Sequence, residues 1–269
     1  MHPPTVDVQR VGAALVVTID RAEARNAVDR PTAEALEAAF RRLDTDDEVA
    51  VGILTGAGGT FCAGADLHAL TDPDRRNRLT EDEHGPMGPS RLRTRKPVIA
   101  AVEGYAVAGG LELACWADLR VVAEDATFGV FCRRWGVPLI DGGTVRLPRL
   151  VGQGVALDLI LTGRPVDATE ALRIGLATTV VPAGTTLPAA LELAERLAAF
   201  PRTTMLADLA SARTAFDVPL DEALLREHRT GVAAIAAGGL DEGVAAFQAG
   251  AGRHGADATA PAATDPSLP

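Results

Sequence analysis

The chain of 269 residues contains no uncharged apolar run that is long enough to cross a lipid bilayer. Residues 1–4 also lack the basic segment, followed by an apolar run, that begins a secretory signal. The three cysteines, Cys62, Cys115 and Cys132, and the five scattered histidines show no spacing typical of a metal site or a redox pair. We therefore expect a cytoplasmic protein with reduced core thiols and no bound metal.

Basic residues are in the minority, with 26 lysines and arginines against 36 aspartates and glutamates. The resulting net charge of −10 argues against nucleic acid as a partner, because phosphate binding needs a basic surface. The glycine-rich residues 56–59 and 152–154 lack the G-x-G-x-x-G spacing of a dinucleotide site with a following acidic residue. A dinucleotide-dependent oxidoreductase is therefore disfavoured.

The chain does contain an alternation of short apolar segments with helical patterns, and its hydrophobic content of 47% can supply a large core. Pro31 opens a helical pattern over Thr32–Leu43, and glycines end two later helices at residues 155–162 and 168–174. Strand, helix and strand in this order predict an α/β fold with a mostly parallel sheet. The expected strands are Ala14–Asp20, Ala50–Thr55, Val98–Val102 and Leu119–Val122.

The C-terminal part of the chain has a helical pattern almost without interruption. We assign residues 1–200 to an α/β core and residues 201–252 to a helical region, and we expect residues 253–269 to be a disordered tail because they are rich in Ala, Pro, Thr and Asp. Residues 68–97 contain few apolar side chains and are expected to form a mobile surface segment. The expected C-terminal helices are residues 187–199, 204–216, 221–237 and 241–251.

Two glycine- and alanine-rich turns, Phe61–Leu67 and Gly104–Leu113, carry the main chemical signal. Each follows an apolar, strand-like segment and precedes a helical pattern. A turn of this kind leaves backbone N–H groups free at the start of a helix and allows a ligand atom to approach closely. Two such turns that face each other could form an oxyanion hole, which stabilises a carbonyl oxygen as it becomes negative.

Together with five further segments in a fixed order, these turns resemble the crotonase family, also called the enoyl-CoA hydratase/isomerase family. The resemblance covers roughly residues 5–250. It implies a crotonase-like repeated ββα core with a helical C-terminal region that builds trimers, often paired into hexamers. It also implies an acyl-CoA thioester as the substrate, as in fatty acid metabolism, and no separate cofactor. The five segments are residues 21–27, 54–61, 141–147, 161–163 and 171–176.

The resemblance also implies roles for individual residues. The backbone N–H groups of Ala65 and Gly109 correspond to the two oxyanion donors, and Glu112 corresponds to the catalytic acid/base. The alternative for Glu112 is an ordinary acidic residue that interacts with the helix dipole. Arg21, Arg25 and the arginines of residues 75–95 could add contacts to phosphate. The positions that line the CoA arm in relatives are Ala24, Ala63, Asp66 and Leu67.

The sequence departs from the hydratase pattern at Cys132, where a typical hydratase has its second catalytic glutamate. A thiol in apolar surroundings is a poor substitute for a carboxylic acid at neutral pH. Asp141 occupies a position that carries a catalytic aspartate in other members, such as dienoyl-CoA isomerases. It could instead be the N-cap of the helix that follows Gly142. Both interpretations of Asp141 are open at the level of sequence.

Three classes of function are consistent with these residues. The first is an acyl-CoA enzyme of the hydratase/isomerase type, in which Glu112 acts as acid/base either alone or together with Asp141. The second is a noncatalytic acyl-CoA-binding homologue, which the cysteine at position 132 suggests. The third is another crotonase reaction, such as a decarboxylation or a thioester hydrolysis, because a shared fold does not fix the reaction. The sequence does not indicate the acyl group, the pathway, or a choice between trimer and hexamer.

Overall fold

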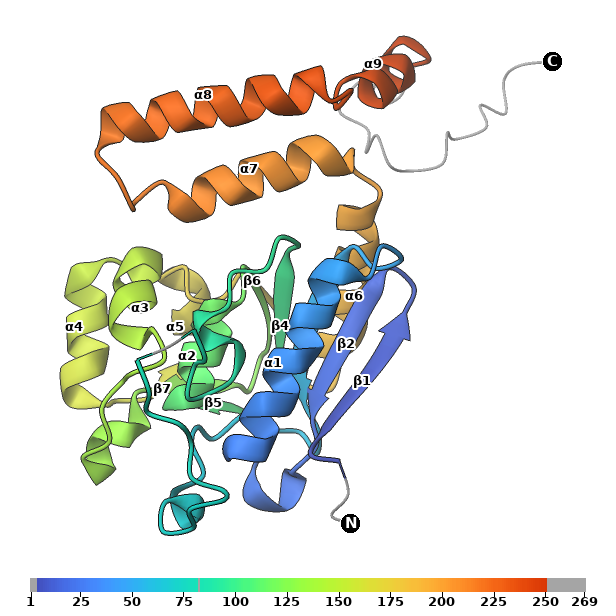
Figure 1. Cartoon of the computed structure of the whole chain (residues 1–269). Helices are drawn as coiled ribbons and strands as arrows, with labels where there is room; N and C mark the ends of the chain where they lie inside the picture. Colours follow the sequence, from blue (N-terminus) through green and yellow to red (C-terminus); the bar gives the residue numbers. More distant parts are fainter. Residues whose placement is uncertain (1–3, 82, 251–269) are drawn as a thin grey trace. The chain divides into compact units, whose positions relative to one another are not determined.

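The larger of two sheets has six strands in the computed structural model, which describes residues 4–81 and 83–250 (Figure 1). The strand order is β1-β2-β3-β4-β6-β9; β1 is antiparallel to β2, and the remaining pairs are parallel. The predicted tail, residues 253–269, and the predicted end of the last helix at residue 251 lie outside the described residues. The strands are β1 (Val6–Val11), β2 (Ala14–Ile19), β3 (Val51–Gly56), β4 (Val98–Val102), β6 (Leu119–Ala123) and β9 (Thr179–Val181).

A second sheet of three strands lies beyond the ends of β4 and β6, and its order is β5 (Tyr105–Val107), β7 (Thr127–Gly129) and β8 (Val166–Asp167). β5 follows β4 directly and leads into α2 (Gly109–Trp116), while β7 follows β6 and leads through the 3-10 helix η4 (Phe131–Trp135) into α3 (Gly143–Val151). Two consecutive ββα units are therefore visible, and the predicted crotonase-like core is confirmed.

The long helix α1 (Arg30–Thr45) packs against β1, β2 and β3. Asp29 caps its first turn by accepting a hydrogen bond from Thr32 N at 3.2 Å. Leu36, Phe40 and Leu43 lie on its buried face and have no exposed surface. Three further 3-10 helices and two α-helices complete the connections: η1 (Ala22–Ala24), η2 (Leu67–Ala69), η3 (Pro89–Arg91), α4 (Gln153–Thr162) and α5 (Ala168–Arg173).

All four predicted strands and the predicted helix over Thr32–Leu43 are confirmed. The sequence pattern missed β1, because this edge strand exposes most of its side chains and carries Asp7, Gln9 and Arg10. It also missed the short strands β5, β7, β8 and β9, which have only two or three residues each. The third discrepancy is in the predicted surface segment, because residues 85–90 are buried.

The chain divides into two compact units, Met1–Ala194 and Glu195–Pro269. The first unit contains both sheets and the helices described above. In the second unit α7 and α8 pack against each other, yet α7 has no buried residue and α8 has only Ala234. None of the helices in the described part of the chain is both long and apolar enough to cross a membrane. The C-terminal helices are α6 (Thr186–Ala198), α7 (Arg202–Thr214), α8 (Leu220–Ala236) and α9 (Asp241–Gln248).

Candidate active site

The two turns predicted from the sequence lie side by side. Phe61 N donates to Glu103 O at 2.8 Å, Cys62 N donates to Tyr105 O at 2.9 Å, and Val107 N donates to Cys62 O at 3.1 Å. These bonds extend the strand pairing past the end of β4 and fix the first turn against the second. The start of α2 is thereby brought next to the residues that follow Cys62.

The N–H groups of Ala65 and Gly109 have no hydrogen-bond acceptor among the described residues, whereas the backbone on either side of Ala65 is paired. Val28 N donates to Gly64 O at 2.8 Å, and Asp66 N donates to Val28 O at 2.9 Å. Gly64 has a φ of +100°, and a Cβ atom built on it would lie 2.9 Å from Gly109 N. The two free N–H groups therefore belong to backbone segments that approach each other so closely that position 64 requires glycine.

Ala108 precedes α2 with a strained backbone conformation, at φ 53° and ψ −124°. A non-glycine residue in such a region costs on the order of 1–3 kcal/mol, and strain of this kind is concentrated at functional sites. The hydrogen bond from Ala108 N to Gly129 O, at 2.9 Å, holds the residue in place. It sets the direction in which the chain enters the helix that carries Gly109 and Glu112.

Glu112 lies in the first turn of α2 and is only 2% exposed. Its Oε1 accepts hydrogen bonds from Asp141 N at 2.9 Å and from Gly143 N at 2.8 Å. Burial raises the pKa of Glu112 to about 7; the bonds from Gly143 and Asp141 oppose this rise, and the charge of Asp141 adds to it. A carboxyl group with this pKa can accept and return a proton near neutral pH.

Asp141 does not cap α3, so the N-cap interpretation is wrong. The N-cap of α3 is Gly142, and no side chain makes a capping hydrogen bond there. Instead, Asp141 Oδ1 accepts hydrogen bonds from Met87 N at 2.9 Å and from Ser90 Oγ, and Oδ2 has no partner among the described residues. Burial raises the pKa of Asp141, against the effect of the hydrogen bonds from Ser90 and Met87. Two carboxyl groups of raised pKa therefore lie next to each other.

Cys132 is in η4 and is 6% exposed. Burial raises the pKa of its thiol, and the negative charge of Glu112 raises it further. The cysteine is therefore close enough to Glu112 for the two groups to interact electrostatically, and its thiol is neutral at physiological pH. It supplies no second acid of the hydratase kind.

The residues that are predicted to line the CoA arm fall into two groups. Leu67 is 42% exposed and Ala24 is half-buried, so both lie at the surface beside the first turn. Ala63 N, however, donates to Arg25 O at 3.0 Å. The side chain of Asp66 is buried, so neither this carboxylate nor the Ala63 N–H group can bind a ligand without breaking an internal contact.

The carboxylate of Asp66 belongs to a buried charge cluster. Its Oδ2 accepts from Arg21 Nη2 at 2.8 Å and from Arg75 Nη2 at 3.1 Å. Arg75 also donates two bonds to Asp29 Oδ2, at 3.0 and 2.8 Å. Arg21 is 7% exposed, so the expectation that this arginine contacts phosphate is wrong. We refer to the buried residues Arg21, Asp29 and Asp66, together with the partly exposed Arg75 that pairs with both carboxylates, as the buried charge cluster.

Sequence reasoning missed Met87, Ser90 and Arg146. Met87 covers the start of α2, since a Cβ atom at Gly109 would lie 2.9 Å from its Cε and Sδ. Ser90 donates to the Asp141 carboxylate, and Arg146 donates to Ser90 O and Asp141 O, so both residues hold the segment that contains Met87. No local pattern marks Met87 or Ser90, whereas Arg146 belongs to a segment, residues 141–147, that carries the family resemblance.

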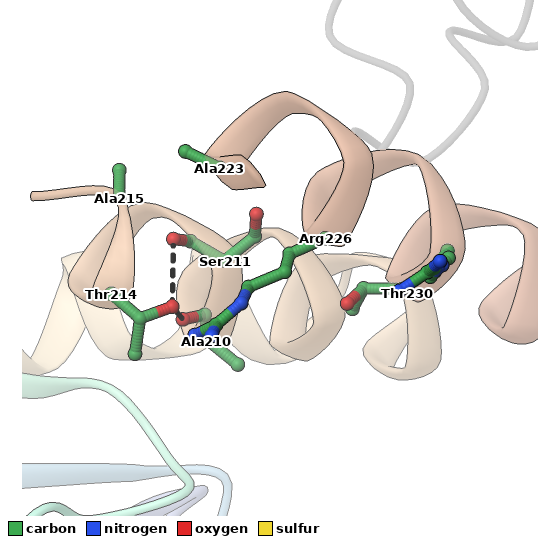
Figure 2. A pocket seen from close by; sticks show the side chains of 8 residues that line it. Ala210, Ser211, Thr214, Ala215, Ala223, Arg226 and Thr230 are labelled. Atoms are coloured by element: carbon green, nitrogen blue, oxygen red, sulfur yellow. Dashed lines mark hydrogen bonds between the residues drawn. The ribbon is translucent and has the colours of Figure 1, made fainter. Parts of the chain in front are cut away.

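A pocket of about 350 Å³ lies in the second unit, between α7 and α8 (Figure 2). Arg226 pairs with Glu222, and Thr214 Oγ1 donates to Ala210 O at 3.0 Å, so these polar groups of the pocket lining already have partners within the chain. It contains none of the predicted catalytic residues, and we do not assign it to the reaction. Its lining consists of Ala210, Ser211, Thr214, Ala215, Ala223, Arg226, Arg229 and Thr230.

The chain is similar to known proteins in both sequence and fold. The enoyl-CoA hydratase/isomerase family matches residues 10–249. Enoyl-CoA hydratase EchA19 of Mycobacterium tuberculosis is 39% identical over 248 residues, which cover 91% of this chain and 93% of that protein. (E)-benzylidenesuccinyl-CoA hydratase of Thauera aromatica is 35% identical over 213 residues, or 79% and 83% of the two chains. The crystal structure of an enoyl-CoA hydratase from Mycobacterium tuberculosis superimposes with a TM-score of 0.87 at 36% identity and covers 92% of this chain and 96% of its own.

Proposed function

Because the chain belongs to the enoyl-CoA hydratase/isomerase family, we propose that it binds the thioester carbonyl of an enoyl-CoA between the N–H groups of Ala65 and Gly109 and that Glu112 transfers the proton. The observation that supports this most directly is the position of Glu112, one turn after an unpaired N–H group and buried at a pKa of about 7. Electrostatic stabilisation and proton transfer would then come from adjacent groups on one helix.

The two N–H groups would act on the carbonyl oxygen. As a nucleophile adds to the β-carbon, or as a base removes a proton, electron density moves onto this oxygen and the thioester becomes enolate-like. Two fixed donors stabilise that charge more strongly than the charge of the ground state, which lowers the barrier. The donors need no movement, because Gly64 and Ala108 fix both turns.

In a hydration, Glu112 would take a proton from water while the water oxygen bonds to the β-carbon. The α-carbon of the enolate would then take a proton from a protonated carboxyl group of the site. In an isomerisation, the same carboxylate would remove a proton from one carbon and return it to another. Hydration is the reaction that we propose first, because the relatives compared above are named hydratases. Their names refer to different acyl groups, so they do not fix the acyl chain of the substrate.

Asp141 is the second carboxyl group of the proposed site. It is the one titratable group near Glu112 that can supply the acid function missing at Cys132, because its Oδ2 has no partner among the described residues. The CoA arm would pass Ala24 and Leu67, which are at the surface beside the first turn. The thioester is a substrate in this proposal, and no further cofactor takes part.

We also propose that the protein is a cytoplasmic trimer or hexamer. Supporting this assembly, large apolar side chains on α8, among them Leu220 and Leu224, are more than half exposed in the single chain. Exposed apolar surface of this kind is typical of a protein interface.

The test is a panel of short, medium and aryl-substituted enoyl-CoA thioesters, with products identified by mass spectrometry. We expect turnover by the wild-type protein, and a loss of about 10²–10⁴-fold in kcat for Glu112→Gln with little change in acyl-CoA affinity. An equally active Glu112→Gln variant would contradict the role of Glu112. Tight binding of every thioester without turnover would instead support a noncatalytic acyl-CoA-binding protein.

A further inference from the structure

The turn that precedes α3 is held from two opposite sides. On one side, Asp141 N and Gly143 N donate to Glu112 Oε1 at 2.9 and 2.8 Å. On the other side, Asp141 O accepts a hydrogen bond from Arg146 Nη1 at 2.9 Å. Asp141 O belongs to the peptide unit that lies between the two donating amides, so the contact with Arg146 holds the part of the turn that joins the two donors.

The same guanidinium group also holds the segment that covers the start of α2. Arg146 Nη2 donates to Ser90 O at 2.6 Å, and the Ser90 hydroxyl donates to Asp141 Oδ1. Met87 N donates to the same Asp141 oxygen at 2.9 Å, and the Met87 side chain lies against Gly109. One planar, two-pronged donor therefore connects the turn that orients Glu112 with the segment that lies over Gly109.

Arg146 makes no ion pair within the described part of the chain, so its charge is not neutralised by a bound carboxylate. The charged or titratable groups that act on it are Glu112 and Cys115 of α2, Asp141, and Arg93 beyond η3. Cys132 of η4 interacts electrostatically with Glu112, and Arg91 of η3 interacts electrostatically with Asp141. Tyr105, the titratable residue of β5, is exposed. Arg146 is therefore the cation that acts on both carboxyl groups of the site.

We propose that Arg146 is a positioning residue of the reaction, whose guanidinium bridges Ser90 O and Asp141 O, aims two backbone N–H groups at Glu112, and keeps Met87 against the start of α2. Its positive charge favours the ionised form of Glu112, which is the form that accepts a proton. The expected effect of Arg146 on turnover rests on the proposed function, whereas its expected effect on the titration of Glu112 does not.

The experiment compares Arg146→Met, Arg146→Lys and Arg149→Met; Arg149 is an exposed residue on the same helix and serves as the control. Turnover of the best enoyl-CoA thioester is measured from pH 5 to 9. Titration of the Glu112 carboxyl is followed by infrared difference spectroscopy, with the Glu112→Gln protein as the reference. Thermal unfolding of each variant is recorded in parallel.

Arg146→Met removes both the bridge and the charge. We expect kcat to fall about 10²-fold, as for a misplaced catalytic group, and the Glu112 titration to move to higher pH by about one unit. Arg146→Lys keeps the charge but can reach only one of the two carbonyl oxygens. Its Glu112 titration should stay near that of the wild type while kcat falls about 10-fold. Arg149→Met should match the wild type in both readouts.

A Glu112 titration that is unchanged in Arg146→Met would overturn the proposal, whatever happens to kcat, because a merely structural arginine would destabilise the fold without moving that titration. Wild-type kcat in Arg146→Lys would also overturn it, since the bridge would then be dispensable. If Arg146→Met does not fold, Arg146→Lys decides the question. If the wild-type protein turns over no thioester, the proposed function fails, and the infrared titration still decides whether Arg146 acts on Glu112.

Discussion

Glu112 is held in surroundings that oppose its own charge. It is almost completely buried, Asp141 lies beside it, and two backbone N–H groups compensate only in part. The consequence is a pKa of about 7, against an ordinary value of 4.5. The ionised form that can act as a base is therefore present at physiological pH only at the expense of the stability of the fold.

This has a measurable effect on stability. Between pH 4.5 and 7 the folded protein keeps the Glu112 proton that the unfolded chain has lost, so the free energy of unfolding falls as the pH rises through this range. Glutamine at this position can accept both backbone bonds and carries no charge. We expect Glu112→Gln to be inactive and more stable than the wild type at pH 8, by up to about 3 kcal/mol.

The measurement is urea unfolding of both proteins at pH 5 and pH 8. The stability difference should be small at pH 5 and large at pH 8. A Glu112→Gln protein that is less stable than the wild type at pH 8 would show that the carboxylate is well solvated or better paired than the structure indicates.

Asp141 combines an anchoring contact with a titratable group, and two substitutions separate these roles. Asparagine keeps an acceptor oxygen for Met87 N and Ser90 Oγ, so Asp141→Asn should fold as the wild type does while kcat falls at least about 10-fold. Asp141→Ala leaves both donors without an acceptor and should also lose about 1–3 kcal/mol of stability. The readouts are kcat and the free energy of unfolding. Full activity in Asp141→Asn would show that Asp141 only anchors residues 87–90.

At the scale of structural elements, the buried charge cluster joins η2, the start of α1 and the segment around Arg75. Burial alone would raise the pKa of Asp29, but the hydrogen bonds from Thr32 and Arg75 and the charge of Arg21 lower it below its ordinary value. Asp29 therefore contributes stability at neutral pH, and this contribution is lost as the pH falls through its lowered pKa. The cluster fixes the turn that carries Ala65.

Removing Asp66 from the cluster leaves the buried guanidinium of Arg21 with Asp29, at 3.6 Å, and Ala27 O as its partners in the described part of the chain. We expect Asp66→Ala to lower the free energy of unfolding by about 2–4 kcal/mol, because a buried cation loses its closest counter-charge. Glu34→Ala is the control, since Glu34 pairs with Arg78 on the surface and should change stability by less than about 1 kcal/mol. Equal unfolding midpoints in urea for the two variants would contradict a structural role of the cluster.

At the scale of the whole molecule, the two units differ in how much apolar surface they bury. The first unit encloses a core of fully buried side chains such as Phe40, Phe61 and Phe128. The helices of the second unit bury almost nothing within the chain, although α8 carries five large apolar residues that are between 46% and 72% exposed. Such a surface needs a partner, and a second copy of the chain fits the proposed assembly. These residues of α8 are Leu220, Leu224, Leu225, Val232 and Ile235.

We expect the wild-type protein to sediment at three or six times the mass of the 27.9 kDa chain. Leu224→Glu places a charge in the apolar surface of α8 and should shift the protein to a smaller species, while Glu227→Gln on the same helix should not. Sedimentation velocity at several concentrations distinguishes the species. A wild-type protein that sediments as a monomer at all concentrations would exclude the proposed assembly.

Much of the first unit could be predicted because its signals are local. The four predicted strands are short apolar runs bounded by glycine or charge, and Glu112 follows Gly109 within one helical turn, so sequence spacing alone places them. The edge strand β1 was missed because only one face of it is partly buried. Residues 85–90 were mistaken for a surface segment because their burial depends on Asp141, which lies more than fifty positions later in the chain.

Local patterns in the sequence are therefore sufficient to predict the family, the α/β core and the position of Glu112 behind the second turn. Contacts between distant segments were needed to show that Asp66 and Arg21 pair with each other, that Asp141 binds Met87 and Ser90 instead of capping α3, and that Arg146 joins them. The reason is physical: turns and helix starts follow from the conformational preferences of neighbouring residues. Hydrogen bonds between distant segments exist only after the parallel strands have brought the ends of β3, β4 and β6 to the same edge of the sheet.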